Sequence, residues 1–236
     1  MSTIIDNYVK RYYPEQDYDY IDIHDIYEYR ARPRDDYLRI LGNVCVRPDD
    51  YGAMKSLHTW DVSACRDFSH MLSWCKFESD ISEWDMNNCI DASFMLSGAQ
   101  DEKFNQNISG WNMGNCKYFY GMFNECKKFN QDISGWNMEN CIDAEGMFAD
   151  CASFDVDISG WDMRNCKNTS RMFEGCTKFN QYISSWDMRN CIDAWRMFKN
   201  CKSFNADISG WKFHDNCNMD EIFDGCKIAD AHKCRI

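Results

Sequence analysis

Tryptophan recurs along this chain at an almost constant interval, and no other feature of the sequence constrains the fold as strongly. The intervals are 24, 27, 25, 25, 25 and 25 residues, between Trp60, Trp84, Trp111, Trp136, Trp161, Trp186 and Trp211. Self-similarity at a period of about 20–50 residues is typical of solenoids, propellers and arrays. The chain is therefore a repeat protein.

Other residue types keep the phase of the tryptophans. An aliphatic residue stands three positions before each Trp. In six units a cysteine stands five after the Trp and a methionine eleven after it, and in most units a second cysteine stands fifteen after it; in the last unit the first cysteine is Cys217, one position later, and Ile222 replaces the methionine. Ordering one unit costs on the order of 1.5 kcal/mol per residue, more than its about seven apolar side chains return, so units have to stack. The residues that we predict to be buried are Ile133, Trp136, Met147, Phe148, Ile158, Trp161 and Phe173.

The local patterns within a unit predict its secondary structure. Short runs such as DISGWDM and NCIDA lie between Gly, Ser and Asn, which favours short parallel strands over helices. The segment xMFxxC is expected to form one helical turn on the other side of the coil. Asparagine precedes the first cysteine in five units, and we expect it to be buried and to bond the neighbouring backbone: Asn88, Asn115, Asn140, Asn165 and Asn190.

The strings FNQDISGW, NMENCIDAEGMF and MFEGCTKFNQ resemble the DUF285 repeat, a member of the BspA-like leucine-rich repeats. The resemblance covers about residues 57–228. Cys and Ala replace the usual Val and Met of that family's NVTDM segment, and these are exchanges among small or apolar residues. The resemblance implies a right-handed, leucine-rich-repeat-like solenoid that binds proteins, as in bacterial surface proteins, protists and large DNA viruses. The predicted fold class is thus a repeat solenoid of about seven coils, with short parallel β-strands and short helical turns, plus a non-repeat N-terminal cap.

Residues 1–56 do not repeat, which divides the chain into this segment, the repeat solenoid at 57–228 and a C-terminal tail at 229–236. The first segment holds all three prolines and nine of the twelve tyrosines. Two interpretations stay open for it. It is a cap over the first coil, because a solenoid needs its open end covered, or an arm for assembly, because tyrosine is favoured at interfaces.

Charge and hydropathy bear on partners and location. The formal net charge is −12 and the pI about 4.8, so the chain is not expected to bind nucleic acid. No apolar run approaches the about 20 residues of a membrane span, so we expect no membrane insertion. The N-terminus lacks the apolar core of a signal peptide, which predicts an intracellular, reducing location or a virion. The fifteen cysteines are then expected to be reduced packing residues.

The sequence holds no pattern that indicates catalysis. GxSxG, P-loop, GxGxxG and HExxH motifs do not occur, and the cysteine spacing of 10 and 15 residues differs from that of zinc sites. The recurring aspartates, such as Asp132 and Asp157, lack the spacing of calcium repeats and are interpreted as turn residues. His70 is interpreted as a solvated repeat position. We therefore expect no enzyme activity, cofactor or metal.

Positions nine and ten residues after the tryptophan differ between units, which predicts an exposed surface with a specific role. Large side chains there are typical of protein interfaces, which are enriched in Trp, Tyr and Arg. For Trp195, the alternative is that it covers the coil edge. The candidate protein-binding residues are Tyr118, Tyr120, Glu145, Arg171, Trp195 and Arg196. The predicted function is protein–protein interaction without catalysis, and the alternative is a structural role in a large assembly such as a virus particle.

Overall fold

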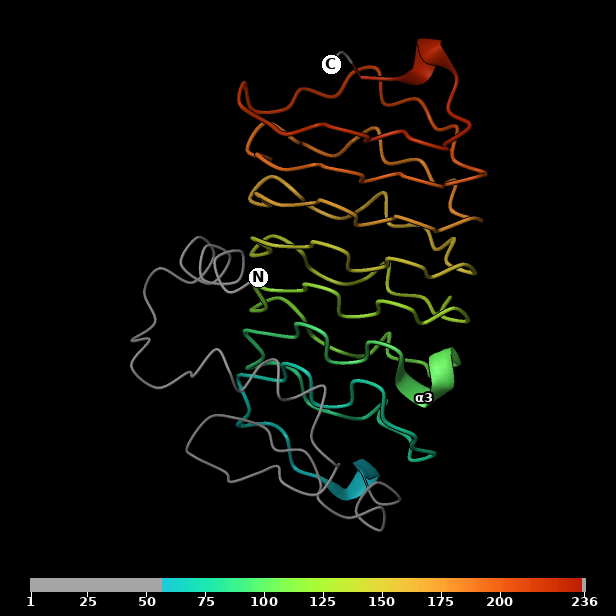
Figure 1. The fold of residues 1–236 in the computed structure, drawn as a ribbon. Helices are drawn as coiled ribbons and strands as arrows, with labels where there is room; N and C mark the ends of the chain where they lie inside the picture. The colour runs from blue at the N-terminus through green and yellow to red at the C-terminus, as the bar shows by residue number, and fades with distance from the viewer. Residues whose placement is uncertain (1–56, 235–236) are drawn as a thin grey trace, which may run out of the picture.

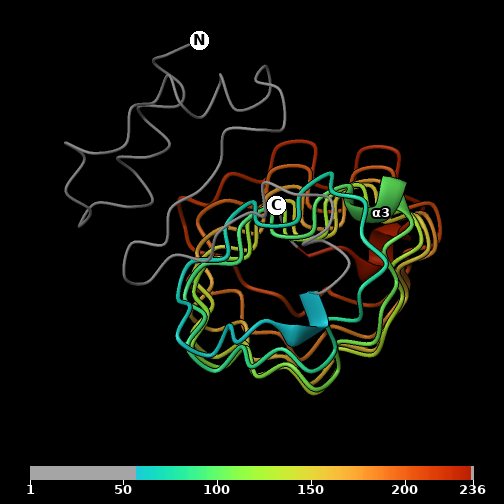
Figure 2. The ribbon, with the colours of Figure 1, turned by 90° about the horizontal axis from the view of Figure 1, so that it is seen from below.

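The computed structural model describes residues 57–234, so the predicted N-terminal cap or arm lies outside the described residues. From Leu57 onward the chain runs through successive turns that stack along one axis (Figure 1). Seen along that axis, the turns follow nearly the same path (Figure 2). The helices of the described part are short: η3 (Leu57–Thr59), α3 (Ala99–Glu102) and η4 (Asp230–His232). None of them is long or apolar enough to cross a membrane.

Single parallel β-bridges join each turn to the next, in the order Asp67, Asp91, Tyr118, Asp143, Asn168, Asp193 and Asn218. Beside the bridges, backbone amides alternate between two kinds of acceptor. The amide of Gly121 donates to the carbonyl of Glu145 in the next turn at 2.8 Å, and that of Met122 donates to Phe119 in its own turn at 3.1 Å. The pairing between turns is parallel. Within residues 57–234, however, each pairing is a single bridge and no longer strand forms. The predicted short strands are therefore wrong in extent.

Residues with positive φ explain why neither strands nor a helical turn form. Left-handed backbone recurs ten residues after the tryptophan, with φ between 54° and 57°, at His70, Phe94, Gly121, Gly146, Arg171, Arg196 and Glu221. A second such position follows four residues later in every one of these turns, at Trp74, Gly98, Glu125, Asp150, Gly175, Asn200 and Gly225. Because an α-helix needs φ near −63°, the predicted helical turn at xMFxxC is replaced by tight turns. The α-helix α3 occurs only in the second unit, where the tryptophan interval is 27 residues.

The core consists of apolar columns that run the length of the stack. Trp84 and Trp111 stack with ring centroids 6.4 Å apart, and Phe148 lies 4.0 Å from Phe154. The predicted burial is confirmed, because Trp136 and Trp161 are 3 % exposed and the other five predicted residues are fully buried. Each turn thus places the same side chains above those of the turn before it.

Each buried indole is hydrogen-bonded to the preceding turn. Nε1 of Trp161 donates to the carbonyl of Ile133 at 3.1 Å, and this carbonyl also accepts the amide of Trp136 at 3.1 Å. The same bond recurs from Trp84 to Trp211, at 2.8–3.3 Å. The tryptophan column therefore buries apolar surface and satisfies a buried donor in one contact.

Asparagine side chains add a second set of bonds between turns. Nδ2 of Asn140 donates to the carbonyl of Gly114 at 2.7 Å, and Asn88, Asn115, Asn165 and Asn190 make the equivalent bond at 2.7–2.8 Å. The expected bond to the neighbouring backbone is confirmed. The expected burial is wrong, because these side chains are exposed and reach the carbonyl from outside the corner.

Apart from Cys234 in the C-terminal tail, the described cysteines fall into two columns. In the second column, four thiols donate to a carbonyl of the preceding turn at 2.9–3.0 Å, as Cys151 does to Phe123; the four are Cys126, Cys151, Cys176 and Cys201. The described cysteines other than Cys65 are free thiols. Cys65 is disulfide-bonded, which corrects the expectation that every cysteine is reduced.

The last turn is covered on one side by the predicted C-terminal tail. The amide of Ile208 donates to the carbonyl of His232 in the tail at 2.9 Å. Ile228, the residue before the tail, is 6 % exposed, and Cys234 within the tail is 4 % exposed. The tail therefore closes the apolar columns at this end on the side of Ile208.

Substituting Trp161 with Phe tests the indole bond between turns. The Trp161→Phe variant loses core volume and one hydrogen bond to a buried carbonyl, so we expect its free energy of unfolding to fall by about 2 kcal/mol or more. The control is Trp74→Phe, because the Trp74 side chain is 50 % exposed. Chemical denaturation of both variants measures the difference, and equal losses would contradict a structural role for the indole.

Candidate functional site

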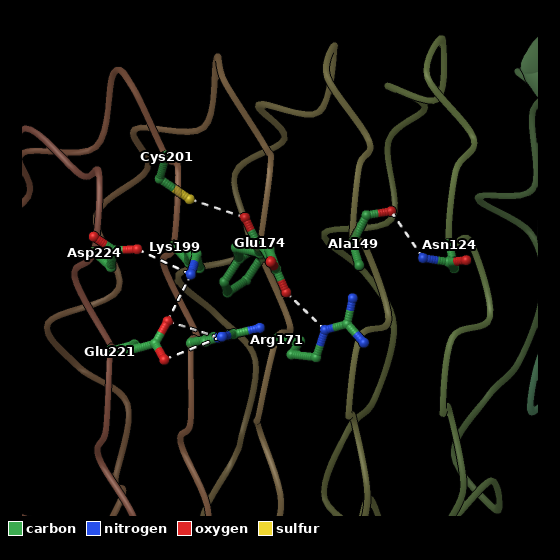
Figure 3. A network of polar contacts seen from close by, with 10 residues as sticks. Asn124, Ala149, Arg171, Glu174, Lys199, Cys201, Glu221 and Asp224 are labelled. Atoms are coloured by element: carbon green, nitrogen blue, oxygen red, sulfur yellow. Dashed lines mark hydrogen bonds and ion pairs between the residues drawn. The ribbon is translucent and has the colours of Figure 1, made fainter.

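The six candidate protein-binding residues lie at the bridge position of their turn, as Tyr118 does, or two or three residues after it, so they line one lateral surface of the stack. All six are partly buried. Figure 3 shows the polar contacts on part of this surface, where side chains from consecutive turns pair with one another. The sequence-based grouping therefore corresponds to one continuous region of the molecule.

The C-terminal part of this surface is a connected cluster. The guanidinium of Arg196 lies 4.2 Å from the centre of the Trp195 ring and makes two bonds to the Glu221 carboxylate of the next turn, at 2.9 and 3.0 Å. Lys199 contacts Glu221 and Asp224, the latter at 2.9 Å (Figure 3). Hydrogen bonds from Arg196 and Lys199 lower the pKa of Glu221 to about 2. These ion pairs hold the Arg196 side chain against the indole.

Arg171 connects this cluster to the middle of the stack. Its Nε donates to Glu174 in the same turn at 2.6 Å (Figure 3), and its charge also interacts with Glu145 and Tyr120 of the preceding turns. Glu145 in turn accepts a bond from Nδ2 of Asn168 at 2.9 Å. The charges of Arg171 and Glu145 therefore attract each other across consecutive turns.

Aromatic residues of the first units continue the same surface. His70 stacks on Phe94 at 4.8 Å, and Phe94 meets Tyr120 edge-on at 4.4 Å. His70 is half-buried, so its interpretation as a solvated position is wrong. Trp74 covers Gly98, where a Cβ atom would lie 2.5 Å from the indole. Sequence reasoning missed Trp74 and Phe94, although they occupy columns that could have been compared between units.

Carboxylates of the bridge column lie beneath this surface, and one of them is buried. Asp143 is 2 % exposed, and Oδ1 of its carboxylate accepts the amide of Glu145 at 2.8 Å. Burial raises the pKa of Asp143 to about 7, and the charges of Glu145 and Asp91 act in the same direction. Burial, with the nearby Asp67, also raises the pKa of Asp91 to about 6.

The remaining aspartate columns close turns. Oδ1 of Asp132 accepts the amide of Ser134 at 3.0 Å, and Oδ1 of Asp162 accepts that of Arg164 at 3.1 Å. The interpretation of these aspartates as turn residues is confirmed. Across residues 57–234, His, Cys, Asp and Glu side chains do not gather in threes around a metal-sized space. A shallow hollow beside Asp162 and Arg189 is lined by aspartate–arginine pairs.

The comparison with family models agrees with the repeat pattern. The model described as "Mycoplasma protein of unknown function, DUF285" matches residues 49–161 and 142–233. The chain belongs to this family. No curated protein and no solved structure matches the chain. In this DUF285 protein, the matched residues include the tryptophan columns and the lateral surface just described.

The buried Asp143 of this DUF285 protein makes its stability depend on pH. Because the folded-state pKa is above the ordinary 3.8, the folded chain binds more protons than the unfolded chain between about pH 4 and 7, so stability falls as the pH rises through that window. Each pKa unit is worth about 1.4 kcal/mol, so the total is on the order of a few kcal/mol. We expect Asp143→Asn, which keeps the acceptor for Glu145, to unfold with a shallower pH dependence.

Asp132→Asn is the matched control for this measurement. Asp132 is exposed, and hydrogen bonds from Ser134 lower its pKa. Its contribution to the free energy of unfolding is therefore lost only as the pH falls below 3.8, the ordinary pKa of an aspartate. Urea denaturation between pH 4 and 7 should therefore show that the free energy of unfolding of Asp132→Asn changes with pH as steeply as that of the wild type. If the free energy of unfolding of Asp143→Asn also changed with pH as steeply as that of the wild type, the assignment of a buried, protonated Asp143 would be contradicted.

Proposed function

We propose that this chain is a leucine-rich-repeat-like solenoid of the BspA type that binds another protein without catalysis. The observation that carries the proposal is the cluster of Trp195, Arg196 and Glu221 on the lateral surface. Trp and Arg are the residue types that dominate binding energy at protein interfaces. Here they are held together at partly buried positions, with the guanidinium 4.2 Å from the indole ring.

The contacts of this cluster favour a binding role over a stabilising one. The side chains of Arg196 and Glu221 are 29 % and 42 % exposed, and ion pairs at the surface contribute about 0–1 kcal/mol to folding, so their bonds have little effect on stability. They fix the orientation of a side chain that otherwise loses conformational entropy when a partner binds. The core columns are the same in each turn, so the surface residues above them are presented at regular intervals on a rigid support.

The alternative proposal is a structural role in a large assembly such as a virus particle. It is favoured by two exposed aromatic side chains at different positions around the turn, Trp74 at 50 % and Tyr182 at 77 % exposure. Contacts on several sides are needed in an assembly, whereas one surface is enough for a binding module. Light scattering of the isolated chain separates the two, because assembly predicts concentration-dependent oligomers and a binding module predicts a monomer.

Replacing the cluster tests the proposed binding surface. We expect Trp195→Ala combined with Arg196→Ala to abolish capture of partner proteins in a quantitative pull-down, with a change in melting temperature of no more than about 3 °C, because the two side chains lie outside the core. Arg189→Ala is the control, since Arg189 is also ion-paired with an acidic residue, Asp187, but lies in another column.

The outcome depends on both measurements. Capture that survives the double substitution, or that is lost equally in Arg189→Ala, would contradict the assignment of this surface. A melting temperature lowered by about 10 °C or more would show that Trp195 packs over the edge of the coil and belongs to the core.

A further inference from the structure

The last turn of the stack ends in a row of backbone amides that have no acceptor. In each preceding turn, amides at alternate positions donate to carbonyls of the next turn, as those of Arg171 and Phe173 do to Trp195 and Met197 at 2.8 and 3.0 Å. The last turn lies at one end of the stack (Figure 1). Its equivalent amides find no acceptor within residues 57–234, and they belong to Met219, Glu221, Phe223 and Gly225.

The apolar side chains beside this row are less covered than their equivalents in the stack. Phe223 and Met219 are partly buried. Phe198 and Ala194, which occupy the same columns one turn earlier, are fully buried. The end of the stack therefore combines free backbone donors with apolar surface that a further turn would cover.

The C-terminal tail covers the other side of the last turn. The amide of Ala229 donates to Oδ1 of Asn205 at 2.8 Å, and the carbonyl of His232 accepts the amide of Ile208. The tail thus follows the path of a further turn over this side only. The edge formed by residues 217–226 stays open, and we call it the open edge.

The charge of the open edge favours a basic partner. Residues 217–226 include three carboxylates and no basic residue. Two of these carboxylates pair with Lys199 of the preceding turn, whereas that of Asp220 has no partner in the part of the chain that the structure describes. Nζ of Lys233 in the tail lies 5.9 Å from the centre of the Phe223 ring. Both the free carboxylate and the ring face therefore attract cations.

We propose that the open edge is a second docking surface, which binds an extended, basic segment of a partner protein as one more half-turn. The segment runs parallel to residues 217–226 and continues the column of bridges at Asn218. Its carbonyls accept bonds from the four free amides. In this mode of recognition, backbone bonds give affinity and side chains give specificity. A basic side chain opposite Asp220 and an apolar one over Phe223 supply that specificity. The open edge adds to the lateral surface of the proposed function and does not depend on it.

A segment of the chain itself supplies the probe. It is a synthetic peptide with the sequence of residues 191–202, in which Ala replaces both cysteines. The segment holds three basic residues and one acidic residue, so its charge complements the open edge. Within the chain, its carbonyls already accept bonds of the required kind at 2.8–3.0 Å, from the amides of Thr169, Arg171, Phe173 and Gly175.

The test adds this peptide to the full chain and follows the backbone amides by NMR. At saturation, we expect hydrogen exchange to slow at least about tenfold at the four free amides, because they pass from water into hydrogen bonds. The amides of Ala194 and Phe198, which are already bonded, should exchange at an unchanged rate. A peptide that carries Arg196→Glu and Lys199→Glu should bind at least about tenfold more weakly, because attraction to the open edge becomes repulsion.

Two variants of the chain make the result decisive. Asp220→Lys should weaken binding about fivefold or more at an unchanged melting temperature, because Asp220 is exposed. Glu83→Lys is the matched control, since it makes the same change in net charge at an exposed position of the second unit, and it should bind as the wild type does.

Three outcomes would overturn the proposal. The first is the absence of saturable shifts of the four amide signals up to about 1 mM peptide, the weak limit of specific binding. The second is equal weakening of binding by Asp220→Lys and Glu83→Lys. The third is protection of the four amides that grows with protein concentration when no peptide is present, because a second copy of the chain would then occupy the open edge.

Discussion

The carbonyl three residues before each tryptophan is the contact on which the rest of the structure depends. The carbonyl of Ile133 accepts both the amide of Trp136 and the indole of Trp161, so one oxygen closes a turn and anchors the next. This bond sets the register between units at about 25 residues. Once the register is set, like residues stack in columns. The apolar core, the outer asparagine bonds and the cysteine columns are consequences of this stacking. The polar bonds and the burial of the rings reinforce one another, because an indole without its acceptor would leave a buried donor unsatisfied.

The periodicity of the sequence was enough to predict the core, because a buried position repeats when its neighbours repeat. It was not enough to predict the backbone. The left-handed position ten residues after the tryptophan is Gly in two units but Arg171 and Arg196 in others, so residue type does not reveal it. The residue propensities favoured short strands and a helical turn. The observed backbone instead follows tight turns that are supported by hydrogen bonds between units, and neither the strand nor the helix pattern describes this path.

The surface was predicted in outline, and its internal contacts were not. Variation between units identified Trp195 and Arg196, but the partner Glu221 lies 25 residues away, and only the stacking brings it within 3 Å. The same reason hid the raised pKa of Asp143, which looks like an ordinary turn aspartate in sequence and is buried by neighbouring turns. It also hid the contacts of the two cysteine columns, which recur with the same period. Thiols of both columns donate to backbone carbonyls, and in the first column sulfurs of neighbouring turns also lie 3.9 and 4.0 Å apart.

Deleting one whole unit is the most direct test of this account. Removing residues 137–161 joins Trp136 to Asp162 and leaves each remaining indole an acceptor one turn before it, whereas removing residues 137–148 places the columns out of phase. Under reducing conditions, we expect the 25-residue deletion to unfold in one cooperative thermal transition, a few degrees lower than the full chain, and the 12-residue deletion to lose that transition. Similar unfolding of both deletions, whether cooperative or not, would contradict a structure held together by the register between turns.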